Sequence, residues 1–275
     1  MRRLILVLLA ACSDRSAPPK SAPPPVVIVD GAAPAPSIDL GPLGAEPPVW
    51  PDATGPAGPV TFAHDFSKPG TWRHTYRQNM TMTANFEGDI MINPIQAKGT
   101  LTIESQRNRT AKATLDAVAR SFGAGSGLPN TSAPLQMVLE LPETGSAKTD
   151  DPQAAMLAIL MPTPPRPLRV GESFEVPFMV PVTGIPGLTS VTGPMTFKFA
   201  GYSQIGTRTC ARFTSRLAID ETRGDAKVKM KLDGRLCLDP ADASVVVSHQ
   251  VIDVKVVSKG PIEMSFAGVL GLDRE

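Results

Sequence analysis

Three histidines, His64, His74 and His249, are the side chains best suited to acid–base or metal chemistry in this chain of 275 residues. His64-Asp65 and His74 could suggest metal ligands, but no cysteine or further carboxylate joins them at a usual zinc spacing. His74 alternates with Trp72 and Tyr76 on an apolar face, so we interpret it as a hydrogen-bonded core residue rather than a general base. We expect no metal and no cofactor.

Other reactive side chains also lack the context that catalysis requires. Ser126 lies in the glycine-rich run 123–127, which resembles a nucleophile elbow in composition but does not lie between a strand and a helix. The pair Asp150 and Asp151 suits the start of a helix, and Asp239-Pro-Ala-Asp242 suits a turn rather than a calcium site. We therefore expect a protein that is not an enzyme, with a hydrolase as the remote alternative.

Cys210 and Cys237 are interpreted as a disulfide pair from the pattern around them. Residues 209–220 and 226–238 both alternate between apolar and polar side chains, and the turn-forming residues Thr222-Arg-Gly-Asp225 separate them. If Arg223 and Gly224 form a two-residue hairpin loop, the two cysteines stand opposite each other, at a separation that a disulfide can bridge. The bond would contribute roughly 3 kcal/mol by restricting the unfolded chain.

The register of this hairpin stays open, because the loop at Arg223 and Gly224 creates repulsive pairs. It sets Arg212 against Arg235 and Arg216 against Lys231. Like charges that face each other across two strands are destabilising. A shift of the pairing by two residues is the alternative.

Cys12, the third cysteine, follows a sequence typical of export signals. The chain begins with Met1-Arg-Arg3, continues with the apolar run Leu4–Leu9 and reaches Ala10-Ala-Cys12. The stretch Leu9-Ala-Ala-Cys12 resembles the lipobox of bacterial lipoproteins. The resemblance implies that residues 1–11 are a signal peptide and that Cys12, once acylated, becomes the first residue of the mature protein. The alternative is an ordinary secretory signal with an incidental cysteine.

An acylated Cys12 would hold the protein on a membrane without crossing it. The run Leu4–Leu9 is much shorter than the roughly 20 residues that span a bilayer. Each buried CH₂ of an acyl chain contributes about 0.8 kcal/mol, and two or more chains give stable attachment. We expect the protein on the extracytoplasmic side of the membrane, and Ser13 after the cysteine favours the outer membrane by the sorting rules of that family.

Residues 12–59 are dominated by proline, alanine, glycine and serine, as in Pro23-Pro-Pro25. Proline lacks an amide donor and disfavours both helix and sheet, so this composition predicts a disordered, lipid-anchored tether. At about 3.1 Å per residue it could reach on the order of 100 Å. Val26–Val29 and Val49-Trp50 are apolar exceptions that could dock on the domain or on a partner.

From residue 60 to residue 275 the pattern changes to the period of two that is typical of half-buried antiparallel strands. In Trp72–Phe86 the even positions are mostly apolar and the odd positions polar, and Leu135–Leu141 and Met195–Phe199 repeat the pattern. Hydrophobic residues make up 42% of the chain, enough for a packed core. We expect a mainly β fold: an antiparallel curved sheet, a half-barrel or a sandwich.

One short segment, Asp151–Met161, favours helix instead. Asp151 can cap it, Pro152 suits its first position, and it is apolar almost all round, so we expect a buried helix. The prolines at 162–167 would end it and divide the domain into halves at about 60–161 and 168–275. Similar stretches recur in both halves, which allows two related β units, namely Gly70–Trp72 with Gly171–Phe174 and Arg109–Ala113 with Arg208–Phe213.

Four methionines, Met80, Met82, Met137 and Met156, are candidates for lining a ligand site, because methionine is flexible and apolar. Plain core packing is the alternative for each. The predicted architecture is similar to the half-barrel carriers of lipids and lipoproteins in bacterial envelopes, which implies an apolar ligand. The strand openings at Gly70–Tyr76 and Pro167–Phe174 also resemble uncharacterised secreted β domains of bacteria, which implies no activity.

The sequence therefore leads to two hypotheses besides the remote enzyme. The first is a non-catalytic envelope lipoprotein that binds an apolar ligand or a protein partner. The second is a structural or assembly component of an envelope complex, with the glycine- and proline-rich stretches 123–131 and 181–193 as contact loops. A formal net charge of +1 excludes a nucleic-acid partner, because such partners require a basic surface.

Overall fold

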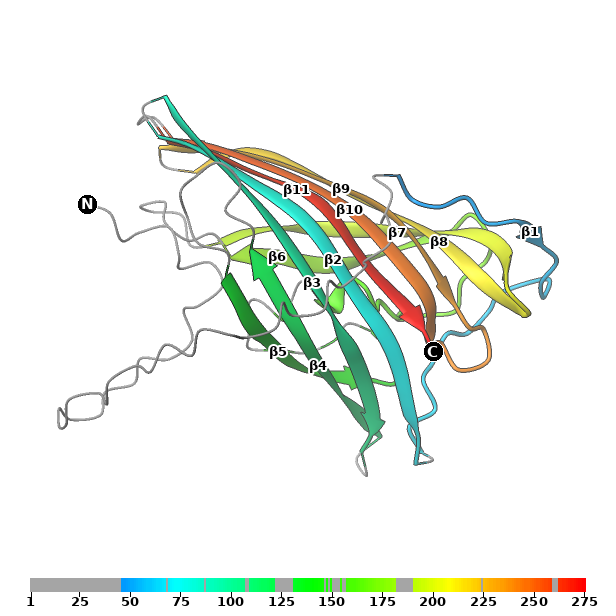
Figure 1. Ribbon diagram of the computed structural model, residues 1–275. Coiled ribbons are helices and arrows are strands. Elements are labelled where there is room, and N and C mark those ends of the chain that lie inside the picture. The colour runs from blue at the N-terminus through cyan, green and yellow to red at the C-terminus, as the bar shows by residue number, and fades with distance from the viewer. Residues whose placement is uncertain are drawn as a thin grey trace, which may run out of the picture.

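The described residues form one long, curved sheet of eleven antiparallel strands (Figure 1). The structure is a computed structural model that describes residues 46–67, 69–86, 88–106, 109–121, 131–145, 147, 149, 154, 157–181, 190–223, 225–258 and 262–275. The strands are β1 (Asp52–Ala53), β2 (Thr71–Phe86), β3 (Asp89–Ser105), β4 (Thr110–Ser121), β5 (Thr131–Pro142), β6 (Ser173–Pro181), β7 (Ser190–Ile205), β8 (Arg208–Arg223), β9 (Ala226–Leu238), β10 (Val245–Ser258) and β11 (Ile262–Arg274).

The sheet is open, with β5 at one edge and β1 and β6 together at the other. The strand order is β1-β7-β8-β9-β10-β11-β2-β3-β4-β5, and β6 pairs with β7 beside β1. We call the end with the connections β2–β3, β4–β5, β6–β7, β8–β9 and β10–β11 the far end, which lies on the left in Figure 1. The opposite end, with the C-terminus, is the near end. The prediction of a mainly β fold with a curved antiparallel sheet is confirmed.

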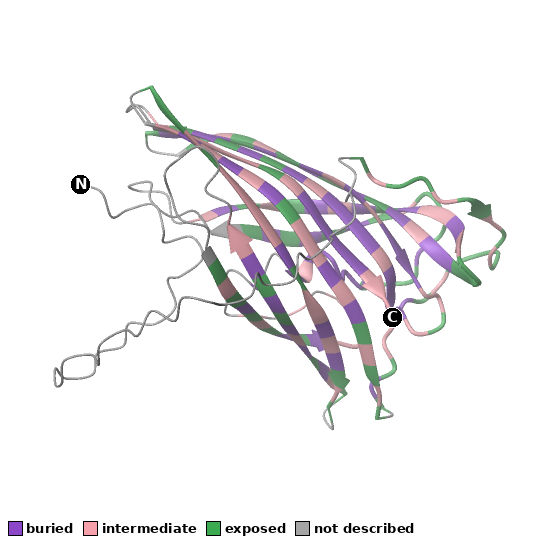
Figure 2. Ribbon diagram, viewed as in Figure 1, coloured by how far each residue is buried: buried purple, intermediate pink, exposed green. Residues whose placement is uncertain are grey.

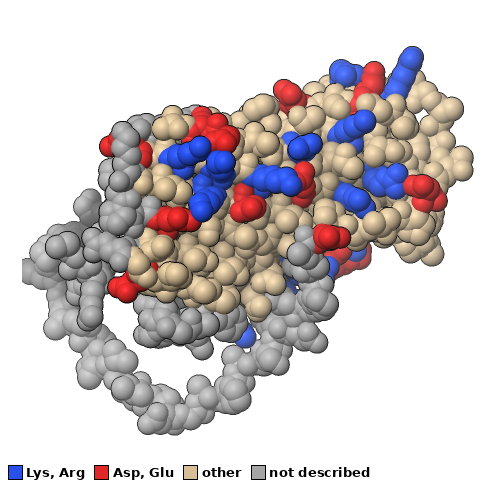
Figure 3. Space-filling view, turned by 90° about the horizontal axis from the view of Figure 1, so that it is seen from above, with Lys and Arg blue, Asp and Glu red and all other residues tan. Residues whose placement is uncertain are grey.

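The alternation of residue types gives the sheet an apolar concave face and a polar convex face. In β4 the side chains of Ala111, Ala113 and Leu115 are fully buried, whereas Lys112 between them is exposed. Figure 2 shows this alternation along most strands. Basic and acidic side chains intermingle over the convex face (Figure 3), where Lys229 pairs with Asp220 at 3.3 Å and Lys231 with Asp233 at 2.9 Å. The convex charges therefore largely neutralise one another.

The helix expected over residues 151–161 falls partly outside the described residues. Residues 154, 157 and 158 have helical backbone, and the amide of Leu160 donates to the carbonyl of Leu157 at 3.1 Å. Ala154, Leu157 and Ile159 are buried, as expected for this apolar segment. Because residues 151–153 and 155–156 are not described, the helix itself stays a prediction.

The two halves of the domain lie side by side in the same sheet. Strands β2–β5 come from the first half and β6–β11 from the second, and the halves join where β11 pairs with β2. The similar stretches open corresponding strands, since Thr71-Trp72 opens β2 where Ser173-Phe174 opens β6. Duplication stays a prediction.

Two connecting segments fill the concave face at the near end. Val60 and Leu168 exchange backbone hydrogen bonds of 2.8 and 2.9 Å, which joins the segment before β2 to the segment before β6. Phe62 is 1% exposed and packs edge-on against Phe199 and Phe213, at centroid distances of 5.6 and 5.3 Å. The near end is therefore closed by a fully packed aromatic core.

Residues 46–59, which the sequence places in the tether, lie against the domain. The carbonyl of Pro48 accepts from Arg235 at 2.8 Å, and Asp52 pairs with Arg212 at 2.7 Å. Trp50 packs against the two cysteines on the convex face. Gly55 lies flat on the ring of Tyr202, where a Cβ would come within 2.2 Å of the ring. The segment thus crosses from the convex face around the β7 edge into the near-end core, and the rest of the predicted tether lies outside the described residues.

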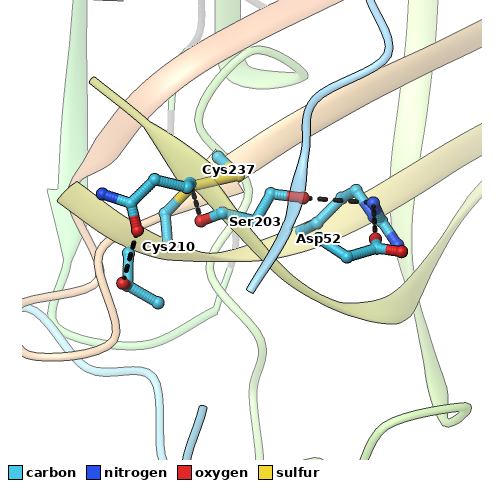
Figure 4. Close-up of a disulfide and its surroundings, with 7 residues drawn as sticks. Asp52, Ser203, Cys210 and Cys237 are labelled. Carbon is cyan, nitrogen blue, oxygen red and sulfur yellow. Dashed lines mark hydrogen bonds and ion pairs between the residues drawn. A yellow bond between two sulfur atoms is a disulfide. The ribbon is translucent and has the colours of Figure 1, made fainter. Parts of the chain in front are cut away.

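The disulfide between Cys210 and Cys237 is confirmed (Figure 4). Its Cα atoms are 5.4 Å apart, within the usual range for such bonds. Both cysteines are fully buried on the convex face, beneath the segment that carries Asp52. The bond therefore joins β8 to β9 at the near end.

The register predicted with the loop at Arg223 and Gly224 is wrong by two residues. Cys237 stands opposite Arg212, not Cys210, and the last pair before the turn is Arg223 with Ala226. The disulfide is consequently diagonal. Charge explains the shift, because the observed register sets Arg216 opposite Asp233, with an ion pair of 4.0 Å, where the predicted one set it against Lys231.

Candidate functional site

The strongest candidate site is an apolar surface on the concave face at the far end. Met82 on β2 stands opposite Phe266 on β11, and Ala84 stands between Met264 on β11 and Met91 on β3. Partners directly opposite each other share a face of the sheet, so these side chains form one patch. We call Met80, Met82, Met91, Met264 and Phe266 the far-end cluster.

Burial on the concave face is uneven at the far end, where Val256 and Ala84 on either side of Met264 are each 2% exposed. Phe199 and Phe213 in the near half are 0% exposed. In the far-end cluster Met80 is 9% exposed and Met82 is 6% exposed, while Met91, Met264 and Phe266 are only half-buried. The cluster is therefore apolar surface that the described residues cover incompletely.

A row of apolar side chains extends the cluster across the sheet. Phe266 stands opposite Val254, Val254 opposite Met230, and Met230 opposite Ile219. With Met82 the row crosses β2, β11, β10, β9 and β8 without a polar residue. At about 4.8 Å between strands it spans roughly 19 Å, which suits an extended hydrocarbon chain.

The predicted methionines are only partly brought together. Met80 and Met82 are in the far-end cluster. Met137 on β5 is half-buried on the same face and stands opposite Leu115. The row of paired residues that begins at Met80 reaches β5 at Thr131, six residues away from Met137. Met156 lies outside the described residues, as does Cys12.

Three members of the cluster, Met91, Met264 and Phe266, were not identified from the sequence. Their alternation along β3 and β11 predicts that each lies on an apolar face. The β2–β3 hairpin brings Met91 beside β2, but only the pairing of β11 with β2, across about 180 residues of chain, brings Met264 and Phe266 next to Met82. A search of the sequence for apolar positions in alternating segments, methionine included, would have found these three residues. It would not have shown that they lie in contact.

Polar side chains on the concave face satisfy one another. Ser215 donates to Oε1 of Gln250 at 2.7 Å, and Gln250 Nε2 lies 3.5 Å from the hydroxyl of Ser248. Gln250 crosses over Gly234, where a Cβ would come within 1.9 Å of Oε1. Gly234 is therefore required for this arrangement, which places polar groups in the middle of the trough, as we call the hollow of the concave face, without exposing them.

A second polar contact reaches the cluster itself. Tyr76 donates to Oε1 of Gln78 at 2.7 Å, and Nε2 of Gln78 lies 3.1 Å from the sulfur of Met80. Burial raises the pKa of Tyr76, so its hydroxyl stays protonated and acts only in hydrogen bonding. These groups position side chains and supply no nucleophile.

The histidines lie at the near end, away from the cluster. Nδ1 of His64 donates to the carbonyl of Asp242 at 3.0 Å, and Nε2 accepts from Thr163 at 3.0 Å. Nε2 of His74 donates to the carbonyl of Val245 at 2.8 Å. Burial lowers the pKa of both histidines, which favours the neutral ring. His249 is buried on β10. The interpretation of His74 as a core residue agrees with its burial, since its side chain is 0% exposed.

Asp239 and Asp242 form a turn between β9 and β10. Oδ1 of Asp239 accepts from the amide of Ala241, and Oδ1 of Asp242 accepts from the amide of Ser244. Arg274 lies 3.5 Å from Asp239 and 3.6 Å from Asp242, so a cation already neutralises the pair. Within the described part of the chain no group of three or more side chains is arranged to hold a metal ion.

No family model matches the chain, and no curated protein matches it. Among solved structures the chain is similar to lipovitellin, in a structure that concerns lipid–protein interactions, with a TM-score of 0.41, 10% identity and coverage of 76% of this chain but 25% of that one. It is also similar to OccK2 (OpdF) of Pseudomonas aeruginosa, with a TM-score of 0.22, 10% identity and coverage of 68% and 62%. These scores are too low to carry an argument about function. No helix among the described residues is long and apolar enough to span a bilayer.

Proposed function

We propose that this chain is a non-catalytic, lipid-anchored protein that binds an apolar ligand on its concave face. The observation that carries the proposal is the far-end cluster, where Met91, Met264 and Phe266 are only half-buried on an apolar face of the sheet. Covering such surface stabilises a complex by about 25 cal/mol per Å² of apolar area. A hydrocarbon chain is the ligand that this surface fits best.

The composition of the cluster supports a flexible ligand. Methionine has three rotatable bonds and a polarisable sulfur, and it adapts to irregular partners. An acyl chain in contact with it would gain about 0.8 kcal/mol for each CH₂ removed from water. The row from Met82 to Ile219 offers a contact surface long enough for many such groups.

The predicted anchor supports a place of action at an envelope membrane. The lipobox-like stretch before Cys12 and the proline-rich residues that follow it suit a protein that is exported and held on the extracytoplasmic side, with the outer membrane favoured by Ser13. A tether of that composition would allow the trough to exchange an apolar ligand with a nearby bilayer.

A protein partner is the second candidate, and one observation favours it. Ile90 and Ile92 on the convex side of β3 are 64% and 47% exposed, at the tip of the β2–β3 hairpin. Exposed apolar residues of this kind often mark interaction sites. A partner bound there would leave the concave cluster uncovered, which separates the two functions experimentally.

Native mass spectrometry of the full chain, extracted from its own membrane, tests the proposal. We expect two added masses: one covalently attached to Cys12, and one that organic solvent releases. Co-purification of a protein with no small apolar mass would instead support the partner function. An unmodified Cys12 would remove the basis for the anchor.

A matched pair of variants then tests the site. Met264→Gln places an amide on the concave face, and Ser265→Gln places the same amide on the convex face one residue away. We expect Met264→Gln to weaken binding of the apolar fluorophore N-phenyl-1-naphthylamine about tenfold, because an amide buried against hydrocarbon loses its hydrogen bonds to water. Ser265→Gln should bind as the native chain does. Equal affinity in all three would contradict the placement of the site.

A further inference from the structure

The ladder between β7 and β8 stops before the far end. Pairing runs from Ile205 with Arg208 to Thr196 with Arg216, and no further pairs follow among the described residues. Residues 190–195 of β7 pair with β6 alone, and residues 217–223 of β8 pair with β9 alone. In Figure 1, β6 and this half of β7 lie apart from the far ends of β8 and β9. We call this interruption of the sheet the seam.

Pro194 explains why the ladder ends there. It stands opposite Pro177 of β6, and two prolines cannot exchange amide hydrogen bonds, so the amide nitrogen of Pro194 points toward β8. The next pair after Thr196 and Arg216 would need an N–H at residue 194, which proline lacks. The seam is therefore encoded in the sequence.

In the part of the chain that the structure describes, side chains bridge the seam on the concave face. A Cβ at Gly193 would lie 2.9 Å from Cδ1 of Ile219 and 3.3 Å from Cδ1 of Leu217, so both side chains lean over this glycine. Ile219 is only half-buried, whereas Leu217 is 2% exposed. Moving Ile219 aside would break apolar contacts between the strands but no backbone hydrogen bond of a β7–β8 ladder.

The seam leads directly to the far-end cluster. Ile219 begins the apolar row that continues through Met230, Val254 and Phe266 to Met82. Val191 and Met195 on the β7 side are 1% and 0% exposed. A hydrocarbon chain that passed between β7 and β8 would meet apolar side chains once it reached the concave face.

We propose that the seam, closed by Ile219 over Gly193, is the lateral gate through which a long hydrocarbon chain reaches the concave face. The proposal rests on the apolar-ligand function proposed above and adds its route and the linear shape of its ligand. A linear chain needs only one side chain to move, whereas a wide ring system would need the strands themselves to separate.

A reversible cross-link tests the gate in the full chain. Because Cγ1 of Ile219 lies 3.2 Å from the Cβ position at Gly193, the Cβ atoms of Gly193→Cys and Ile219→Cys would lie within about 5 Å, close to disulfide distance. The matched control is Lys198→Cys with Thr214→Cys, which joins the same strands at an exposed pair where the ladder is intact. Peptide mass mapping verifies each engineered bond and checks that the native disulfide, whose cysteines are fully buried, stays intact in the reductant.

Stopped-flow uptake of trans-parinaric acid, a fluorescent fatty acid with one linear hydrocarbon chain, is the readout. We expect the oxidised seam variant to take up the probe about tenfold more slowly than its reduced form, while the control pair and the native chain do not respond to the reductant. An unchanged rate with the bond verified would overturn the gate and leave the binding function standing. A native chain that does not bind the probe at all would overturn both.

A single substitution gives an independent answer if the cross-linked variant does not fold. Ile219→Ala removes the side chain that bridges the seam and keeps every backbone pair of β8 and β9. We expect probe uptake to become about threefold faster or more, because less apolar contact must break before the chain enters. Uptake at the native rate in a folded Ile219→Ala protein would overturn the gate.

Discussion

The two ends of the concave face have the same alternating pattern but are covered differently. At the near end, segments that precede β2 and β6 cross the trough and bury Phe62, Phe199 and Phe213 completely. At the far end, the described chain leaves Met264 and Phe266 half-buried. Alternation therefore makes a face apolar, but the crossing segments decide whether that face becomes core or binding surface.

The ends also differ in what restrains their strands. The near end has the disulfide, the ion pair of Asp52 with Arg212 and the packing of Trp50 on the convex face. At the far end the ladder between β7 and β8 is missing beyond Thr196. This distribution of restraints predicts a rigid near end that holds the fold and a looser far end that admits a ligand.

Replacement of Phe62, whose ring is central to the near-end core, should have the largest effect on the free energy of unfolding. Phe62→Ala should lower the free energy of unfolding by about 3–5 kcal/mol, because it leaves a cavity between two buried aromatic rings. Urea unfolding followed by circular dichroism measures the loss. Phe266→Ala is the far-end control and should cost clearly less, since its ring is half-buried. Equal losses would remove the distinction between the ends.

Loss of the disulfide should come next in size. Cys210→Ser with Cys237→Ser should lower the free energy of unfolding by about 3 kcal/mol, because the bond closes a long loop in the unfolded chain. Trp50 packs against these cysteines, so its fluorescence should shift toward that of exposed tryptophan, with Trp50→Phe as the spectroscopic control. Probe uptake through the far end should not change. A change in uptake would show that the two ends are coupled.

Local patterns predicted much of the fold because they report on single strands. Alternation in Trp72–Phe86 corresponds closely to β2, and the turn at Thr222–Asp225 joined the strands that carry the disulfide. The register was wrong because turn residues allow two loops that differ by one position, and only charge pairs such as Arg216 with Asp233 separate them.

What the sequence did not predict depends on distant contacts. The far-end cluster requires β11 to pair with β2, and residues 46–59 lie against the domain through partners such as Arg212 and Arg235. Composition alone described that segment as a tether, since prolines dominate it and its partners are more than 150 residues away in the chain. Cys12, Met156 and most of the tether lie outside the described residues, so those predictions stand as they were made.

Acid should loosen the near end selectively. Burial holds the pKa of His64 and His74 below the ordinary value of 6.5, so the unfolded chain binds more protons below that pH. Stability should therefore be full above about pH 6.5 and decrease as the pH falls, and urea midpoints measured from about pH 7 to pH 5 report it. His64→Gln should flatten this dependence. Retention of the full slope in that variant would assign the effect to other groups.

The smallest change is expected where the structure leaves a methionine half-buried. Met264→Ala at the far end should lower the free energy of unfolding by about 1 kcal/mol or less, because much of this side chain already contacts solvent in the folded state. Met161→Ala removes the same side chain at the near end, where Met161 is 2% exposed, and should cost about 2–5 kcal/mol. Urea unfolding compares the two directly.

Addition of N-phenyl-1-naphthylamine should stabilise the Met161→Ala protein as it does the native chain. It should stabilise the Met264→Ala protein less, since a ligand stabilises a protein more when its affinity for the folded state is higher. If Met264→Ala lowers the free energy of unfolding as much as Met161→Ala does, Met264 is a core residue. The far end then has no binding surface that distinguishes it from the near end.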